Sequence, residues 1–390
     1  MNVTENWRLR VDGGEIVGRP AVLSDGDVIV GTLQGSVYRI NPISNGTVIW
    51  KVYAGSIVGA PVVDQDDTIY FGSGDRNVWA LTPDGMTKWQ YLTQQPLMTA
   101  PLLLDMMYLY DGSYSDPGVV IGGLDGILYK LNLDGTEAWT FQTGGQIRGA
   151  ASVTHDGKIL FGSTDMYLYC ISAKDGSLQW KYNAYQEITS KPLVQDVSIV
   201  FGTRQNNSDS GRIIALKFDG TWRWEISITS SVEGEPIEDP ETGTVYAASN
   251  DGKIFAIQAD GAMQWRYVTG GSGGVCGDYS KISDENASPT VSGKCSFSEL
   301  GAHGATSPCF VHGMLVTSSA NKFVYGLGLD GSLLWKFGTR KRIKAPVRCL
   351  SSTDSFGRTS VTVLAASNDR YLYSIDVSVN PSRDSSNFPC

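Results

Sequence analysis

The residues that most often carry catalysis are sparse in this sequence. Its three histidines are His155, His303 and His312. His155-Asp-Gly and His312-Gly are typical of turns, and His303 ends a long loop. A hydrolytic triad needs a histidine oriented by a carboxylate beside a nucleophile, and nothing in the spacing indicates one. We therefore expect no catalytic residue here.

The cysteines do not have the spacing of a metal site. Six occur, and no two form a CxxC or CxxxC pair, which argues against zinc. Cys276 and Cys295 bracket one loop and could form a disulfide. Free thiols throughout are the alternative, so the cysteines do not fix the compartment.

Two further segments resemble ligand loops only in part. The run from Asp64 to Asp67 holds three aspartates but lacks the glycine and distal glutamate of a calcium loop. The run from Gly270 to Gly274 is not followed by Lys-Ser/Thr or by a helix, so it does not predict a phosphate cradle. We predict no metal and no cofactor.

Composition indicates a well-packed globular protein without a nucleic-acid partner. Of the 390 residues, 41% are hydrophobic and 18% are charged, and the net charge is −9. An acidic chain of this kind is a poor candidate for binding nucleic acid through bulk charge. No apolar run approaches the ~20 residues that span a bilayer, and the N-terminal residues show no charged-then-apolar leader.

A tryptophan motif repeats along the whole chain. Seven tryptophans follow a glycine by four residues, and each glycine is preceded by Asn or Asp. Asn-Gly and Asp-Gly favour the tight turns of β-hairpins, because both residues tolerate positive φ. The seven pairs are Gly46/Trp50, Gly85/Trp89, Gly135/Trp139, Gly176/Trp180, Gly220/Trp224, Gly261/Trp265 and Gly331/Trp335.

A second motif, about ten residues after each tryptophan, gives a count of eight. It reads as a small residue (lysine in the last copy), any residue, then proline or alanine. The copies are 18–20, 59–61, 99–101, 149–151, 190–192, 234–236, 306–308 and 344–346. Trp7 precedes the first copy just as the other tryptophans precede theirs. It is therefore an eighth tryptophan strand, whose hairpin partner is the unpaired strand 371–377 at the other end of the chain.

These counts predict an all-β fold, a single eight-bladed β-propeller of four-stranded antiparallel blades. The unit spacing of about 40 residues is that of a propeller blade. We expect the propeller to span residues 1–379. The N-terminal strand 5–11 would complete the last blade, 344–377, and so close the ring. A long insertion, 270–304, separates blades six and seven, and residues 380–390 form a tail.

The repeat resembles the pyrroloquinoline-quinone-type (PQQ-like) propeller family. The resemblance rests on the small-Leu-x-x-x-Asp-Gly-x-x-x-Trp pattern, as in 80–89 and 215–224, and covers essentially the whole chain. It implies that the tryptophans lie on outer strands and dock against the neighbouring blade. The family includes quinoprotein dehydrogenases, but also non-catalytic scaffolds such as an eight-bladed lipoprotein that assists outer-membrane protein assembly.

The chain departs from the dehydrogenase pattern. That pattern, as the family is known, includes adjacent cysteines joined by a disulfide, calcium ligands and long pocket-building insertions. This sequence has no Cys-Cys pair and mostly minimal blades. The resemblance therefore favours a non-catalytic member and an extracytoplasmic location, periplasmic or secreted.

Loop positions suggest where a partner would bind. In a four-stranded meander, the loops that join one blade to the next and those between strands two and three lie on one face. This face receives the 270–304 insertion and a run of basic residues, and insertions on rigid scaffolds often carry function. We expect a protein partner to contact the basic residues Arg340, Lys341, Arg342, Lys344, Arg148 and Lys191. The alternative is that the basic run is an ordinary solvated loop and that the insertion has no binding role.

Alternatives remain open at this stage. The opposite face carries the seven Asn/Asp-Gly turns and should be acidic. A glycan- or surface-binding propeller is the second hypothesis. The 104–117 loop is crowded by Met106, Met107, Tyr108, Tyr110 and Tyr114, and it could be an interface anchor, a sugar platform or a loop folded onto its own blade. A quinone-dependent dehydrogenase is the third.

Overall fold

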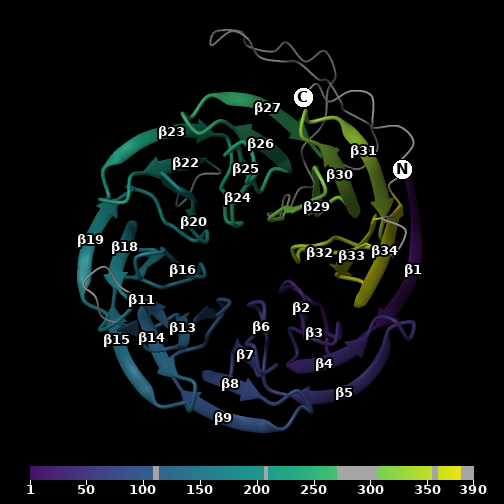
Figure 1. The fold of residues 1–390 in the computed structure, drawn as a ribbon, viewed down its shortest axis with the longest axis horizontal. Helices are drawn as coiled ribbons and strands as arrows, with labels where there is room; N and C mark the ends of the chain where they lie inside the picture. Colours follow the sequence, from purple (N-terminus) through teal and green to yellow (C-terminus); the bar gives the residue numbers. More distant parts are fainter. Residues whose placement is uncertain (109–113, 206–209, 270–305, 354–358, 379–390) are drawn as a thin grey trace.

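Eight four-stranded antiparallel sheets form a ring in the computed structural model of the chain (Figure 1). The structure describes all residues except 109–113, 206–209, 270–305, 354–358 and 379–390. No helix occurs among the described residues, so none there is long and apolar enough to cross a membrane. The prediction of an eight-bladed β-propeller is confirmed.

Each of the first four blades runs outward from a short inner strand. Blade one consists of β2 (Ala21–Val22), β3 (Val28–Gly31), β4 (Ser36–Asn41) and β5 (Thr47–Tyr53). Blade two consists of β6 (Val62–Val63), β7 (Ile69–Gly72), β8 (Asn77–Leu81) and β9 (Thr87–Leu92). Blade three consists of β10 (Leu102–Leu104), β13 (Gly118–Gly122), β14 (Ile127–Asn132) and β15 (Glu137–Gln142). Blade four consists of β16 (Ser152–Val153), β17 (Lys158–Gly162), β18 (Tyr167–Ser172) and β19 (Leu178–Asn183). A separate pair, β11 (Met107–Tyr108) and β12 (Tyr114–Ser115), forms a hairpin beside blade three.

The remaining blades follow the same order, except the last. Blade five consists of β20 (Leu193–Val194), β21 (Ile199–Gly202), β22 (Gly211–Leu216) and β23 (Trp222–Ile228). Blade six consists of β24 (Ile237–Glu238), β25 (Val245–Ala248), β26 (Lys253–Ile257) and β27 (Met263–Val268). Blade seven consists of β28 (Cys309–Val311), β29 (Met314–Ser319), β30 (Phe323–Gly328) and β31 (Leu333–Gly338). Blade eight consists of β32 (Arg348–Thr353), β33 (Thr359–Ser367), β34 (Tyr371–Ser378) and β1 (Asn2–Arg10).

The two ends of the chain share blade eight. Strand β1 pairs antiparallel with β34, from Asn2 opposite Ser378 to Arg10 opposite Tyr371. The register shifts between Glu5 and Trp7, where β1 contains an irregularity. The first strand of the chain therefore closes the ring, as predicted, and begins a few residues earlier than expected.

The apolar core lies between neighbouring blades. The second strands are buried along most of their length, whereas the outer strands alternate exposed and half-buried residues, as in β9 and β15. One cluster joins Val316 of blade seven to Val363 of blade eight, and another joins Val120 of blade three to Phe161 of blade four. Each blade is thus stabilised mainly by burying apolar surface against its neighbours.

Seven tryptophans each form a hydrogen bond from one blade to the next. Each indole N–H donates to a backbone carbonyl in the next blade's turn between strands three and four, at 2.7–3.3 Å. The donor–acceptor pairs are Trp7–Pro42, Trp50–Pro83, Trp89–Leu133, Trp139–Ala173, Trp180–Phe218, Trp224–Ala259 and Trp265–Leu329. The expected packing of the tryptophans against the neighbouring blade is confirmed.

The seam between blades seven and eight is built differently. Blade eight has no hairpin turn between its outer strands, because these come from opposite ends of the chain. The indole N–H of Trp335 instead faces Met314 Sδ of its own blade, at 3.2 Å. Across this seam a disulfide joins Cys309 of β28 to Cys349 of β32. The predicted pair, Cys276 and Cys295, lies outside the described residues, as does the 270–304 insertion.

Candidate functional site

A cavity of about 740 Å³ lies at the propeller axis. All eight blades contribute to its wall, mainly through residues that lead into or begin the inner strands. Most of them belong to the motif of a small residue, any residue and proline or alanine, or are its neighbours in sequence. Asn250, from the turn between strands two and three of blade six, also contributes. The cavity therefore lies towards the face that carries the blade-to-blade connections.

The glycines of the motif allow the inner strands to converge there. A Cβ at Gly18 would lie 2.7 Å from the carbonyl oxygen of Gly59, and one at Gly59 would lie 2.2 Å from that of Thr99. At Gly149 the nearest atom would be the carbonyl oxygen of Ser190, at 2.7 Å. Only glycine permits this approach of one blade's backbone to the next.

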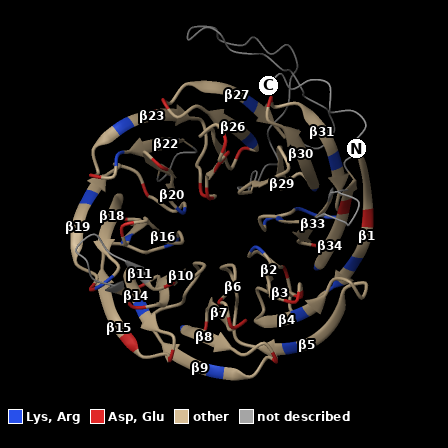
Figure 2. Cartoon of the chain, viewed as in Figure 1, with Lys and Arg blue, Asp and Glu red and all other residues tan. Residues whose placement is uncertain are grey.

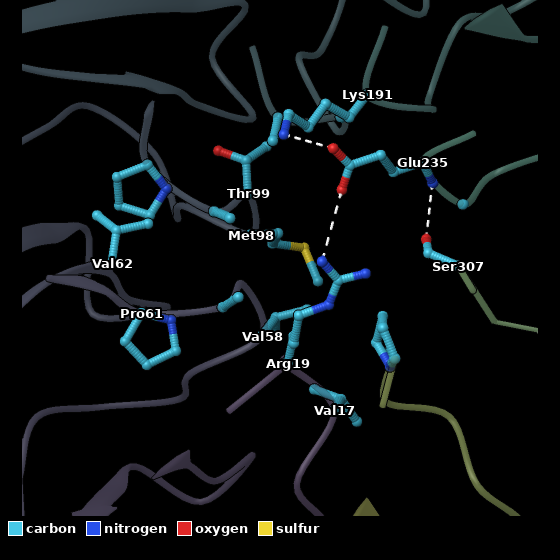
Figure 3. A pocket seen from close by; sticks show the side chains of 18 of the residues that line it. Val17, Arg19, Val58, Pro61, Val62, Met98, Thr99, Lys191, Glu235 and Ser307 are labelled. Carbon is cyan, nitrogen blue, oxygen red and sulfur yellow. Dashed lines mark hydrogen bonds and ion pairs between the residues drawn. The ribbon is translucent and has the colours of Figure 1, made fainter. Parts of the chain in front are cut away.

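Three charged side chains meet across the axis. Arg19 from blade one, Lys191 from blade five and Glu235 from blade six each occupy the middle position of the motif. Figure 3 shows Lys191 and Arg19 directed towards the Glu235 carboxylate. Lys191 Nζ lies 2.5 Å from Glu235 Oε1, and Arg19 Nη1 lies 3.9 Å from Glu235 Oε2. The Glu235 backbone amide donates to Ser307 Oγ at 2.7 Å, which ties this strand to blade seven.

Cations outnumber carboxylates around the cavity. In Figure 2, Lys and Arg positions lie near the inner ends of the sheets, around β2, β16 and β20. The carboxylates in the wall are Glu233 and Glu235. The cationic wall residues are Arg19, Arg148, Lys191, Lys344 and Arg348.

The cations differ in how they are paired. Lys344 Nζ lies 3.5 Å from Glu15 Oε2, and Arg148 Nε donates to Gln146 Oε1 at 2.8 Å. Within the described part of the chain, Arg348 has no ion-pair partner. Burial, and next the charge of Arg19, lower the pKa of Arg348.

The other side of the cavity is apolar. Val58, Pro61 and Val62 from blade two and Met98 from blade three line it (Figure 3). No cluster of three or more His, Cys, Asp or Glu side chains suited to a metal occurs among the described residues. The arrangement can bind a group that is negatively charged on one side and apolar on the other.

The structure divides the predicted partner-binding residues into two groups. Arg148, Lys191 and Lys344 line the cavity. Arg340, Lys341 and Arg342 are exposed in the connection between β31 and β32, outside the cavity wall. The guanidinium of Arg340 lies 5.8 Å from the ring centre of Tyr371.

Sequence reasoning missed Glu235, Ser307 and Glu233. Glu235 and Ser307 occupy the same middle position of the repeated motif as Arg19 and Lys191. Aligning the eight copies by that position would have brought out both residues. Glu233 precedes the motif and has no such signal.

The histidines considered for catalysis lie away from this cavity. His155 and His312 are exposed in turns, and His312 has a φ of 45°. His303 lies outside the described residues. The cavity wall among the described residues contains no histidine and no cysteine.

Comparison with known proteins identifies the family of the chain. The family described as outer membrane protein assembly factor BamB matches residues 4–113 and 124–298, well over half of the chain. The chain belongs to the BamB family. The outer membrane protein assembly factor BamB of Yersinia pestis is 25% identical over 232 residues. That match spans 54% of this chain and 59% of the relative.

Solved structures share the fold along nearly the whole chain. BamB from Moraxella catarrhalis has a TM-score of 0.69 at 15% identity, covering 96% of this chain and all of that one. Sqt1 from Saccharomyces cerevisiae has a TM-score of 0.70 at 9% identity, covering 97% of this chain and all of that one. The computationally designed Ika8 protein has a TM-score of 0.67 at 14% identity, covering 95% and 98%. At these identities the likeness concerns the fold alone.

Proposed function

We propose that this chain is a non-catalytic protein-binding scaffold or assembly subunit. Membership of the BamB family and a relative named as an assembly factor support this role. The proposed contact surface, here called the connection face, carries the blade-to-blade connections. It includes the basic connection of residues 340–344 and the 270–304 insertion, which joins β27 to β28.

We choose the connection face because cationic side chains are concentrated on it although the protein as a whole is acidic. Arg340, Lys341 and Arg342 are exposed in one connection, on the same side as the cation-rich axial cavity. The chain as a whole has a net charge of −9. A local positive surface on such a chain favours an acidic partner surface and accelerates its association.

A charge-reversal comparison tests the proposal. One variant carries Arg340→Glu, Lys341→Glu and Arg342→Glu. A matched control carries Lys51→Glu, Lys217→Glu and Arg223→Glu, which lie on outer strands or on a turn of the opposite face. Each tagged protein is used to recover partners from the envelope fraction of the native source at low salt.

The expected result is a protein partner recovered by the wild type and by the control, and lost or at least tenfold reduced with the connection-face variant. Raising the salt concentration should weaken the wild-type complex, because exposed charges are screened within about 10 Å at 0.1 M salt. Equal recovery by the wild type and the connection-face variant at low salt would contradict the choice of face.

A further inference from the structure

The axial cavity holds more positive charge than its carboxylates neutralise. Glu235 is shared between Lys191, at 2.5 Å, and Arg19, at 3.9 Å. The other wall carboxylate, Glu233, pairs with Arg204 at 3.4 Å, which is not a wall residue. Arg348 therefore has no counter-ion among the described residues, and Arg19 has only a distant share of one.

The two guanidinium groups also have unused donors. Nε and Nη2 of Arg19 and Nε of Arg348 are buried, and none has a hydrogen-bond partner within the described structure. Buried polar groups are normally hydrogen-bonded, and charges removed from water are normally paired. The positive charge of Arg19 also disfavours the charged form of Arg348, and an anion bound between the two guanidinium groups would offset this repulsion.

We propose that the axial cavity is a binding site for an oxyanion, a phosphate or carboxylate group held by Arg19, Arg348 and Lys191. Guanidinium groups bind both kinds of oxyanion through paired N–H donors, and lysine adds a point charge. Arg19 and Arg348 come from blades one and eight, and Lys191 approaches from the opposite side of the ring. A bound anion would thus connect the adjacent blades one and eight to blade five across the axis.

The volume and lining of the cavity indicate the size of the ligand and the chemistry of its remaining part. A cavity of about 740 Å³ is larger than one oxyanion and lies within the range of small-molecule sites. Its apolar side, formed by Val58, Pro61 and Met98, would contact a hydrocarbon portion. The same chemistry has two sources: a free organic acid or phosphate, or an acidic side chain of a partner that enters the cavity.

Thermal unfolding and titration calorimetry test the site with defined probes. The probes are inorganic phosphate, succinate and a short glutamate-rich peptide, with ionic strength held constant by sodium chloride. The variants are Arg19→Gln and Arg348→Gln. The control is Arg223→Gln on outer strand β23, whose guanidinium contacts the Val197 carbonyl and not the cavity.

We expect at least one probe to bind the wild type and the control. At about twenty times its dissociation constant it should raise their unfolding midpoint by about 2–4 °C. Affinity should fall at least tenfold in Arg348→Gln and in Arg19→Gln. Calorimetry at 25 °C gives this comparison even if a variant is less stable. Arg348→Lys provides a second check, because it keeps the charge but loses the paired donors, and should bind more weakly than the wild type.

The probes separate the two sources. Binding of phosphate or succinate indicates a free anion, and binding of the peptide alone indicates an acidic segment of a partner. Binding of no probe, or equal binding by the wild type and Arg348→Gln, overturns the proposal. The two proposals can fail separately, because Arg340, Lys341 and Arg342 do not line the cavity. Their reversal should leave probe affinity within about twofold.

Discussion

The indole ring of Trp224 lies against Gly261, the glycine of the next blade's hairpin turn. A Cβ at Gly261 would lie 2.7 Å from Trp224 Cγ, and the Trp224 N–H donates to the Ala259 carbonyl in the same turn at 3.1 Å. The same contact recurs at the seven Asn/Asp-Gly turns, where an added Cβ would lie 2.7–2.9 Å from the preceding blade's indole. Each glycine therefore serves two blades, because it forms the turn of one and receives the tryptophan of the other.

Substitutions of Trp224 should distinguish the contribution of its hydrogen bond to stability from that of the burial of its ring. Trp224→Phe keeps an aromatic ring but removes the indole donor. We expect the lost hydrogen bond to lower the free energy of unfolding by about 1 kcal/mol, in addition to the cost of the packing that the smaller ring loses. Trp224→Ala should cost about 3–5 kcal/mol, because this tryptophan is only 6% exposed. Trp222→Phe, two residues earlier on the same strand, is the control.

Trp222 is 55% exposed, so its substitution should change stability by less than about 0.5 kcal/mol. Urea denaturation followed by circular dichroism gives all three values. A cost for Trp222→Phe equal to that of Trp224→Phe would show that the contact with the next blade adds nothing specific.

Two glycines with the same φ separate the effect of the tryptophan contact from that of backbone strain. Gly135 and Gly26 both have a φ of +89°. A Cβ at Gly135 would lie 2.7 Å from Trp89, whereas one at Gly26 would meet nothing within 4 Å. Gly26→Ala should cost about 1–2 kcal/mol from backbone strain alone. Gly135→Ala should cost about 1–3 kcal/mol more, because the indole must shift. If both substitutions lower the free energy of unfolding equally in urea, backbone strain alone, and not the contact with the indole, accounts for the need for glycine at residue 135.

The ring was predictable from the sequence because its determinants are local and repeated. The Asp-Gly turns and the tryptophan four residues later define each outer hairpin, and Trp7 without such a turn indicated the closure. The spacing within one blade does not reveal which blade an indole contacts. The pairing of Trp224 with Gly261 therefore became visible only in three dimensions.

The cavity was less predictable, because it depends on side chains that converge from opposite blades. The loop positions predict Arg148, Lys191 and Lys344 as partner-binding residues on the connection face, and the structure places them with Glu235 in the cavity wall. Cys309 and Cys349, which are 40 residues apart, gave no sequence signal of pairing. They lie on the adjacent inner strands β28 and β32, which the arrangement of the blades places side by side.

The disulfide should contribute to stability, because the seam between blades seven and eight lacks the tryptophan hydrogen bond of the other seams. Replacement of both Cys309 and Cys349 by serine should lower the free energy of unfolding by about 2–4 kcal/mol, given a closed loop of 40 residues. A reducing agent should lower the unfolding midpoint of the wild type but leave that of the double variant unchanged. If reduction affects both proteins equally, another cysteine pair is responsible.

Buried tyrosines should make the propeller sensitive to alkaline pH. Burial and a hydrogen bond to Asp369 raise the pKa of Tyr373 to about 12, and burial with the charge of Asp239 raises that of Tyr246 to about 12. The Tyr373 hydroxyl donates to Asp369 Oδ2 at 2.5 Å. The unfolded chain ionises its tyrosines near pH 10, before the folded chain does. Stability should therefore stay constant below pH 10 with respect to these groups and fall as the pH rises from 10 to 12.

Urea unfolding between pH 8 and pH 11.5, with tyrosinate absorbance recorded in parallel, measures this loss. Tyrosinate from the buried residues should appear together with unfolding and not before it. Tyr373→Phe should reduce the slope of stability against pH above pH 10, because it removes one group that ionises only on unfolding. Tyr53→Phe, at a position 72% exposed, is the matched control and should leave the slope unchanged. An identical slope in wild type and Tyr373→Phe would mean that this hydroxyl is free to ionise in the folded ring.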